Sequence, residues 1–517
     1  MSKNCNYWWV TRPKRKLNSI PETLSVFAEA TLQHRWDGSR NLHVQFEDAL
    51  EEAGLKRPGS RRDGGGSGGR TYAAWLRSLG LICEESSTKQ VYLTLAGEAL
   101  VDGKSPVKVL KKQVLEYQFP SQFSLSVGVD SRFRIKPFRF LLALLMDDRI
   151  KTLSTDEVGK IVITEAETEK DFEKIVKRII DYRNFGDEIL EDDFFKKYLP
   201  EADADSKDPF QKLKDIANTM FNWLEYTQLI GRDIGIVFIP DEKKLEVREI
   251  LSQKSTLIDN AADSEFFQRK YGIDPWHHKD TRNLLATKTV TAKSIDEQKI
   301  KNALLMLASK HPIKNIDTKI IDYVVDVTGA DPKLVENTLL VSFPHGLIGG
   351  FLANYYEMAF KGTEEATEFE VATTELFRDV FGYNAIHLGQ TGSKSAPDIL
   401  LLSDSEGYQA IIDNKAYSKY SITGDHHNRM VHNYIEKVGN YSESSYPIAF
   451  FSYIAGGFIS TFDKQIATEV EESGIHGSGI TVATFIKMIE QNAEKNYSHK
   501  QLRDIFSLDR EIKLGDI

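Results

Sequence analysis

Apolar and polar positions in the first 100 residues predict two helices followed by a short β-ribbon. Within residues 43–55 the apolar side chains recur at helical spacing, at Phe46, Ala49, Leu50 and Ala53. A second helix is expected from residue 71 into a strand near residue 82, and another strand covers 91–95. Helix, turn, helix and hairpin is the order of elements in winged-helix domains. We therefore predict a mainly helical, winged-helix-type domain over residues 1–150.

The middle of the chain has a similar order of elements. An amphipathic stretch covers 169–183, and an apolar run at 221–231 leads into a strand at 234–238. This pattern predicts a second winged-helix-like domain over residues 151–254. Residues 255–345 are expected to form a helical connector.

The last 150 residues predict a helix followed by a β-hairpin, and hence an α/β domain over residues 346–517. The hairpin strands are expected at 399–402 and 408–415, with a turn at 404–407. The preceding helix, 369–383, has a single apolar face that leaves Glu375 beside it; this face consists of Phe369, Ala372, Leu376 and Val380.

This hairpin carries the residues with the clearest chemistry. Asp398 opens the first strand, and Asp413 and Lys415 lie two apart on the second, so these two project to the same face. Pairing of the strands brings Asp398 close to Asp413. Two carboxylates can hold Mg²⁺, which polarises a phosphate and activates water. Lys415 can orient that water, and Glu375 can complete the metal shell.

Surface hairpins also carry Asp and Lys without any function. The strand that carries Lys415 is apolar before the motif, with Ala410, Ile411 and Ile412. Because a buried charge is costly unless it is paired or bound to a metal, this context favours a catalytic site.

Charge and composition point to a localised DNA-binding surface. The net charge of the chain is -10, but residues 1–120 hold 18 Lys and Arg against 13 Asp and Glu. Glycines in the loop 56–70 would let the backbone approach a phosphate, and basic side chains would neutralise it. A flexible solvated linker, a soluble terminus and chance variation in charge are the alternatives. The predicted DNA-binding residues are Arg57, Arg61, Arg62 and Arg70 in the loop, and Lys14, Arg15 and Lys16 near the N-terminus.

Cysteines and hydropathy exclude several classes of protein. Cys5 and Cys83 are the only cysteines, which argues against a disulfide framework and a cysteine zinc site. No apolar run approaches the length of a membrane span, and the N-terminus lacks the apolar region of a signal peptide. We therefore expect a cytoplasmic bacterial protein.

Residues 375–437 resemble the FokI-like cleavage domains of type IIS restriction endonucleases, and the likeness extends more loosely over 350–517. The matching pieces are FGYNAIHLG at 381–389, PD at 397–398, IIDNKAYS at 411–418 and NYIEK at 433–437. The resemblance implies a PD-(D/E)XK nuclease fold with a mixed central sheet, Mg²⁺ as cofactor, Asp398, Asp413 and Lys415 as catalytic residues and Glu375 as the acidic residue of the helix. Asn414, between Asp413 and Lys415, departs from the pattern, but its side chain is expected to point to the other face.

The N-terminal half is similar to the AlwI, MlyI and PleI group of type IIS enzymes and their nicking relatives. The resemblance implies recognition of a short asymmetric DNA site, cleavage a few base pairs outside it, and a partner methyltransferase. A strand-specific nickase, a modification-dependent endonuclease and a non-catalytic DNA-binding regulator are the alternatives. The similar segments are KKQVLEYQFPSQ at 111–122, IKPFRFLLALL at 135–145 and SEFFQRKYG at 264–272.

One such site cuts one strand, so double-strand cleavage needs two nuclease domains or two successive nicks. Residues 429–438 predict a helix whose apolar side packs on its own domain. Its other side carries Arg429, Asn433 and Glu436, which resemblance implies as a transient dimer contact on DNA. An ordinary solvated helix face is the alternative. The apolar side consists of Met430, Val431, Tyr434, Ile435 and Val438.

Overall fold

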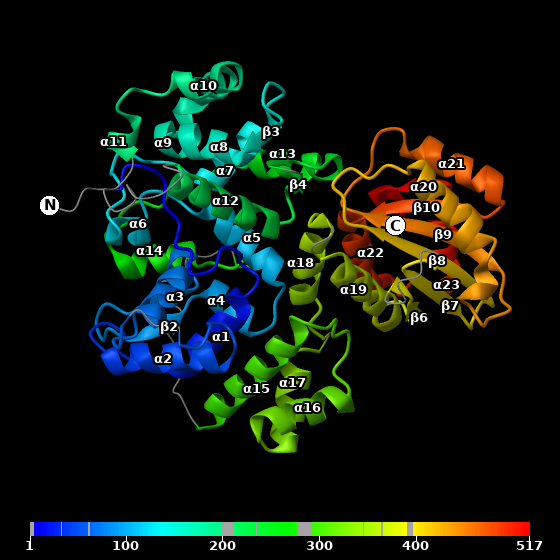
Figure 1. Ribbon diagram of the computed structural model, residues 1–517. Coiled ribbons are helices and arrows are strands. Elements are labelled where there is room, and N and C mark those ends of the chain that lie inside the picture. Colours follow the sequence, from blue (N-terminus) through cyan, green and yellow to red (C-terminus); the bar gives the residue numbers. More distant parts are fainter. Residues whose placement is uncertain are drawn as a thin grey trace. The chain divides into compact units, whose positions relative to one another are not determined.

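The chain folds into two compact units in the computed structural model, and each is described by itself (Figure 1). Unit 1 comprises residues 1–230, 234–306 and 317–344, and unit 2 comprises 231–233, 307–316 and 345–517. None of the described helices is long and apolar enough to cross a membrane. The structure describes residues 5–32, 34–59, 63–198, 210–233, 235–277, 292–344, 346–362, 365–389 and 396–517.

Unit 1 contains the two predicted helices and the hairpin, α2, α3 and β1–β2, and an additional helix, α1, precedes them. Helix α3 starts at Ser67, four residues before the predicted start, because the glycine-rich segment enters the helix. Strands β1 and β2 pair antiparallel, as expected of a hairpin. The winged-helix assignment itself stays a prediction. The elements are α1 (Ile20–Thr31), α2 (Arg40–Glu52), α3 (Ser67–Ser78), β1 (Ile82–Glu84), β2 (Val91–Leu93), α4 (Leu95–Val101), α5 (Pro106–Glu116), α6 (Gln122–Ser126) and α7 (Pro137–Met146).

Glycines before and within α3 allow it to pack closely on α2. A Cβ atom on Gly69 would lie 2.4 Å from the carbonyl oxygen of His43, and one on Gly68 would lie 2.1 Å from a carboxylate oxygen of Glu47. Gly66 has a φ of 73°, the left-handed region that favours glycine. These glycines therefore serve helix packing, a structural role distinct from the predicted approach to phosphate.

The segments before and after residue 150 share one core. Trp223 is fully buried and stacks on Phe138 with 5.7 Å between ring centroids, while Tyr117 meets Trp223 edge-on at 5.9 Å. Aromatic packing thus joins the segments on both sides of residue 150, and the domain boundaries stay a prediction. The remaining principal elements before residue 345 are β3 (Thr152–Ser154), α10 (Phe172–Phe185), α12 (Gln211–Tyr226), β4 (Gly231–Asp233), β5 (Ile236–Phe238), α13 (Lys244–Ser252), α14 (Ser264–Tyr271), α15 (Ala292–Ala308), α16 (Thr318–Thr328) and α17 (Pro332–Ser342).

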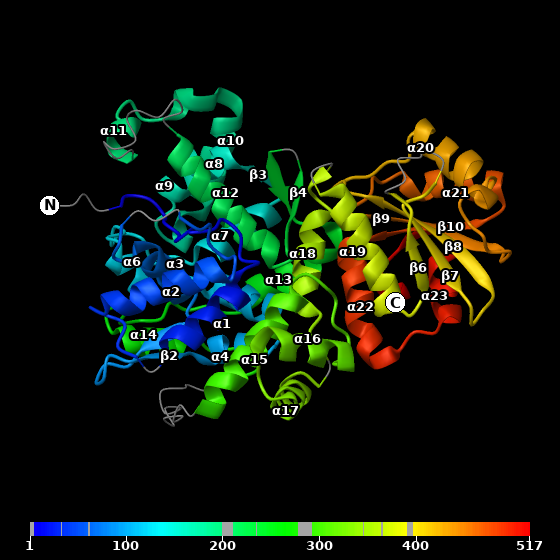
Figure 2. The same cartoon turned by 60° about the horizontal axis from the view of Figure 1, so that its bottom comes forward.

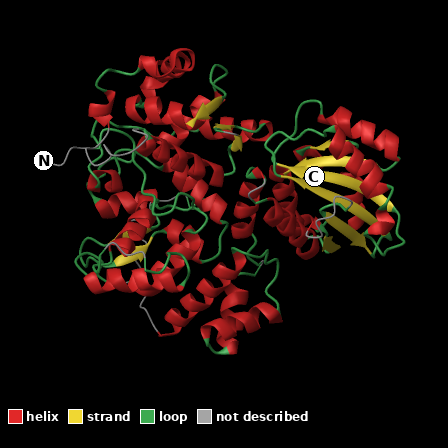
Figure 3. Ribbon diagram, in the orientation of Figure 1, coloured by secondary structure: helices red, strands yellow, loops and turns green. Residues whose placement is uncertain are grey.

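Unit 2 contains a six-stranded mixed sheet in the order β11-β10-β9-β8-β7-β6. The first three strands along the chain pair antiparallel, and β8 to β11 pair parallel with one another. The yellow arrows of Figure 3 show this sheet between layers of helices. Its strands are β6 (Asn384–His387), β7 (Ile399–Ser403), β8 (Tyr408–Lys415), β9 (Ile448–Ala455), β10 (His476–Thr481) and β11 (Arg510–Ile512).

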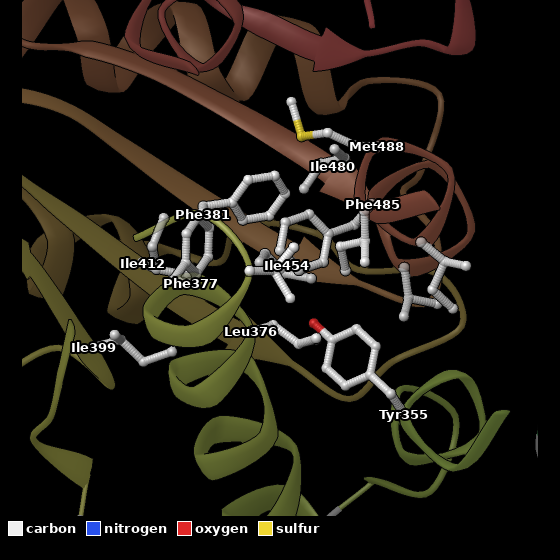
Figure 4. Close-up of a cluster of buried hydrophobic side chains, with 14 of the residues drawn as sticks. Tyr355, Leu376, Phe377, Phe381, Ile399, Ile412, Ile454, Ile480, Phe485 and Met488 are labelled. Atoms are coloured by element: carbon white, nitrogen blue, oxygen red, sulfur yellow. The ribbon is translucent and has the colours of Figure 1, made fainter. Parts of the chain in front are cut away.

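Helices cover both faces of this sheet, so successive residues of its central strands are buried on opposite sides. Ile412 belongs to the core under one helical layer, which Figure 4 shows, and Ile411 belongs to the core under the other. In Figures 1 and 2, α18, α19 and α22 lie on one side of the sheet and α20 and α21 on the other. The helices are α18 (Gly349–Met358), α19 (Ala366–Asp379), α20 (Gly424–Asn428), the π-helical η8 (Arg429–Ile435), α21 (Phe462–Ser473), α22 (Val482–Lys495) and α23 (His499–Phe506).

Candidate active site

The hairpin β7–β8 brings the predicted acidic pair together. Ile399 pairs with Ile412 in the antiparallel register, so Asp398 lies opposite Asp413 at the end of the strands. The Nζ of Lys415 lies 2.5 Å from an oxygen of Asp413, and their side chains are only 14% and 6% exposed. The structure therefore places two carboxylates and an ammonium at one point.

Asn414 has a larger role than the sequence suggested. Its side chain points to the other face, as expected, and there its amide nitrogen donates to the carbonyl oxygen of Phe369 at 3.2 Å and contacts Thr373 Oγ1 at 2.5 Å, both on α19. Its backbone N–H donates to Oδ2 of Asp398 at 2.7 Å. Asn414 thus fixes both α19 and one of the two carboxylates.

The electrostatics of the pair suit a bound cation. Burial and the neighbouring Asp413 carboxylate raise the pKa of Asp398 well above its ordinary value. Burial alone lowers the pKa of Lys415, but the two carboxylates outweigh it and the net pKa is raised, so the lysine stays protonated. Two adjacent carboxylates that repel each other are a donor set that a hard divalent cation would stabilise.

The carboxylate pair fits Mg²⁺ better than a cation that needs a full protein shell. Within the described ranges, no group of three or more His, Cys, Asp or Glu side chains is arranged to hold a metal ion. Mg²⁺ is usually held by one or two carboxylates, with water and substrate phosphate oxygens completing its shell. Asp398 and Asp413 match that requirement.

Glu375 has a partner outside the acidic pair. Its carboxylate lies 3.4 Å from Nδ1 of His311, while α19 turns Phe369 and Thr373 toward Asn414. The place of Glu375 in the metal shell stays a prediction.

Glu370, on the same helix, acts electrostatically on Asp398. Its carboxylate adds to the rise in the pKa of Asp398, and it accepts a contact from Nε2 of His387 at 3.0 Å. A Cβ atom on Gly389 would lie 2.1 Å from an oxygen of Glu370, and the N–H of Gly389 donates to the Asp398 carbonyl. Glu370 was not predicted from the sequence, although it borders the apolar face of α19 as Glu375 does.

Several basic residues predicted to bind DNA have structural partners. Arg15 pairs with Asp215 at 2.9 Å, and Lys14 is half-buried with its pKa lowered by that burial. Arg70 donates to the carbonyl oxygen of Gly65 at 2.6 Å. Arg57, which is exposed, and Lys16 also have partners. Arg61 and Arg62 lie outside the described residues.

Arg70 also borders a hollow that sequence reasoning missed. A cavity of about 430 Å³ is lined by Arg40 and His43 of α2, by Arg70 of α3, and by Gly38, Asp63 and Gly65. Arg40 donates to the carbonyl oxygen of Gly64 at 3.3 Å. The two arginines therefore converge on one opening beside the glycine-rich loop.

The helix predicted at 429–438 is present, but it begins earlier and changes its winding. It runs through α20 and continues as the π-helical η8 to Ile435. Its predicted apolar side is buried at Met430, Val431, Tyr434 and Ile435. The three predicted contact residues lie elsewhere on it: Arg429 pairs with Asp425 at 2.6 Å, Asn433 accepts from Lys437 at 2.9 Å, and Glu436 contacts His432 at 3.0 Å.

Comparison with known families agrees with the resemblances read from the sequence. The sequence profile of the AlwI restriction endonuclease matches residues 77–336, which is half of the chain. The chain belongs to this family. The profile of the FokI cleavage domain matches residues 329–513 and so spans the mixed sheet and the carboxylate pair.

Individual relatives are more distant. The type II restriction enzyme StsI of Streptococcus sanguinis is 25% identical over 150 residues, 27% of this chain and 24% of that enzyme, so the match spans about a quarter of that relative. The structure of restriction endonuclease FokI is 15% identical, covering 98% of this chain and 100% of that one with a TM-score of 0.29. The BpuJ1 endonuclease binding domain, in complex with pyrene- and phenanthrene-modified DNA, is 14% identical over 51% of this chain and 95% of that one, with a TM-score of 0.36. At TM-scores this low, neither structural likeness supports a conclusion about this chain.

Proposed function

We propose that this protein is a type IIS restriction endonuclease. It would recognise a short asymmetric site in double-stranded DNA and hydrolyse phosphodiester bonds a few base pairs outside it, using Mg²⁺. The observation that carries the proposal is the meeting of Asp398, Asp413 and Lys415 at the end of β7 and β8, within the segment that matches the FokI cleavage domain. Membership of the AlwI family supports site-specific recognition.

Each side chain of the site would have a separate role in the reaction. Asp398 and Asp413 would hold Mg²⁺, and Glu370 or Glu375 of α19 would take part through water. When bound, the ion polarises the scissile phosphate and lowers the pKa of a water molecule. Lys415, whose pKa the two carboxylates raise, would act as a donor that orients the attacking water and offsets negative charge on the phosphorane. Asn414 keeps Asp398 in place through its backbone N–H.

DNA recognition is assigned to unit 1. Its helices and hairpin would act as winged-helix-type domains, and the cavity lined by Arg40, His43 and Arg70 offers two guanidinium groups to a phosphate or to a base edge. The predicted division at residues 150, 254 and 345 belongs to this proposal. A methyltransferase would protect the host DNA.

Double-strand cleavage would use two nuclease units that meet on DNA through the outer side of η8. Arg429 and Asn433 of η8, with Glu436 just after it, would form the contact, and a two-fold contact would place the same patch against itself. Because the unit holds one carboxylate pair, each copy would cut one strand.

Incubation with plasmid DNA in the presence and absence of Mg²⁺ tests the proposed function. We expect cleavage only with Mg²⁺, and sequencing of the ends should show cuts at fixed offsets from one asymmetric site. Nicked circles as the final product would indicate a strand-specific nickase, and cleavage of methylated plasmid alone would indicate a modification-dependent enzyme. Specific binding without cleavage under any metal would contradict the proposal and favour a regulator.

A further inference from the structure

Three buried tyrosines surround the Asp413 side of the candidate active site. Tyr453 lies directly opposite Asp413 in the parallel pairing of β8 and β9, so both side chains project to the same face. Tyr420 packs on Tyr453 with 5.3 Å between ring centroids, and Tyr434 comes from η8. Burial raises the pKa of each phenol, and the Asp413 carboxylate adds to the rise in all three. Asp413 is therefore flanked by buried tyrosine side chains.

A buried carboxyl group accepts a hydrogen bond from one of these tyrosines. The hydroxyl of Tyr453 donates to Glu469 of α21, 3.0 Å from Oε1 and 3.2 Å from Oε2. Glu469 is fully buried. Nδ1 of His427 lies 3.8 Å from Glu469, and Nε2 of the same ring lies 2.8 Å from Glu472. The Tyr453–Glu469 pair thus joins the strand beside Asp413 to α21 and to the helix α20.

Burying the Glu469 carboxyl group at this position costs free energy. Burial raises the pKa of Glu469 to about 8, although the hydrogen bond from Tyr453 opposes that rise. The group is therefore largely neutral at pH 7 and does not compete with Asp413 for a cation. An apolar residue of similar size would avoid the cost of burying a polar group. The carboxyl group accepts the hydrogen bond of the Tyr453 hydroxyl, which an apolar side chain could not do.

We propose that Glu469 is a positioning residue of the nuclease site, which acts by holding the Tyr453 phenol and, through it, the Asp413 carboxylate. This inference rests on the proposed nuclease function. Groups that orient a metal ligand without touching the metal commonly change metal affinity by about 10-fold or more when they are replaced. The full chain with Glu469→Leu should therefore bind the catalytic cation about 10-fold more weakly.

Metal binding can be measured apart from cleavage. Tb³⁺ bound at Asp413 would be excited through the surrounding tyrosines, and displacement of Tb³⁺ by Mg²⁺ gives the affinity for Mg²⁺. We expect Glu469→Leu and Tyr453→Phe each to raise the Mg²⁺ concentration for half-displacement, and also that for half-maximal cleavage, by about 10-fold. Glu469→Gln, which keeps a neutral acceptor, should stay close to wild type. The matched control is Glu471→Leu, which replaces an exposed acid on the same helix.

The outcomes separate this inference from the proposed function. If Tyr453→Phe, which leaves the acid in place, and a folded Glu469→Leu variant both bind Mg²⁺ like wild type while wild type cleaves DNA, the positioning role is wrong and the nuclease stands. A Glu469→Gln variant as weak as Glu469→Leu would also overturn it, because acidity and not the acceptor would then matter. If Asp413→Ala leaves Tb³⁺ binding unchanged, the metal site is wrong and both proposals fall.

Discussion

The buried Glu469 carboxyl predicts a pH-dependent loss of stability that one substitution should remove. Its pKa in the folded protein is about 8, against an ordinary value of 4.5. The folded state therefore holds the proton more tightly than the unfolded chain, and this contribution is fully present below pH 4.5 and is lost as the pH rises through 8. The difference corresponds to about 5 kcal/mol across that range, or about 1.4 kcal/mol per pH unit within it.

Urea unfolding of wild type and Glu469→Gln at several pH values between 5 and 8, in EDTA, measures this contribution. Glutamine cannot ionise, so the stability of the variant relative to wild type should rise steadily with pH, whatever fixed offset the substitution adds. Glu471→Gln, at an exposed position on the same helix, should follow wild type. Parallel curves for wild type and Glu469→Gln would refute the reasoning, because Glu469 would then ionise alike in the folded and unfolded states.

Three further predictions concern the metal, the DNA and the dimer. Glu370→Gln should raise the Mg²⁺ requirement for cleavage by about 10-fold, more than Glu375→Gln, since the Glu370 carboxylate adds to the rise in the pKa of Asp398; equal effects in a Mg²⁺ titration would contradict this ranking. Arg70→Ala should weaken DNA binding and reduce its salt slope by about one, whereas an unchanged slope would show that Arg70 does not meet a phosphate. Arg429→Glu should leave nicked circles as the main product; linear plasmid formed at a rate first order in enzyme would exclude dimerisation through this helix.

The parts of the site that depend on local pattern could be predicted from the sequence. Strand β8 has the predicted bounds, 408–415. The strand begins after the turn that ends at Gly407, and its apolar run ends at the charged residues Asp413 and Lys415. The register of β7 with β8 follows from that short turn, and it places Asp398 opposite Asp413. Alternation along the strand likewise predicts that Asn414 points away from the pair.

The parts that depend on packing between distant segments could not be predicted. Glu370 and Glu375 both border the apolar face of α19. The rotation of the helix on the sheet decides which of the two carboxylates acts electrostatically on Asp398. The π-helical winding of η8 has no counterpart in the spacing of its apolar residues. Likewise, Glu469 lies more than 50 residues after Asp413, and only the parallel crossover brings α21 beneath Tyr453.

The most direct test of the central claim is cleavage and binding by Asp413→Ala. With Mg²⁺ and plasmid that carries the recognition site, this variant should bind the site with nearly the affinity of wild type and should show no cleavage, because the change removes a metal ligand from unit 2 and leaves unit 1 intact. Asp404→Ala, which replaces an exposed carboxylate in the turn of the same hairpin, should cleave like wild type. Normal cleavage by Asp413→Ala with Mg²⁺ would contradict the assignment of the active site.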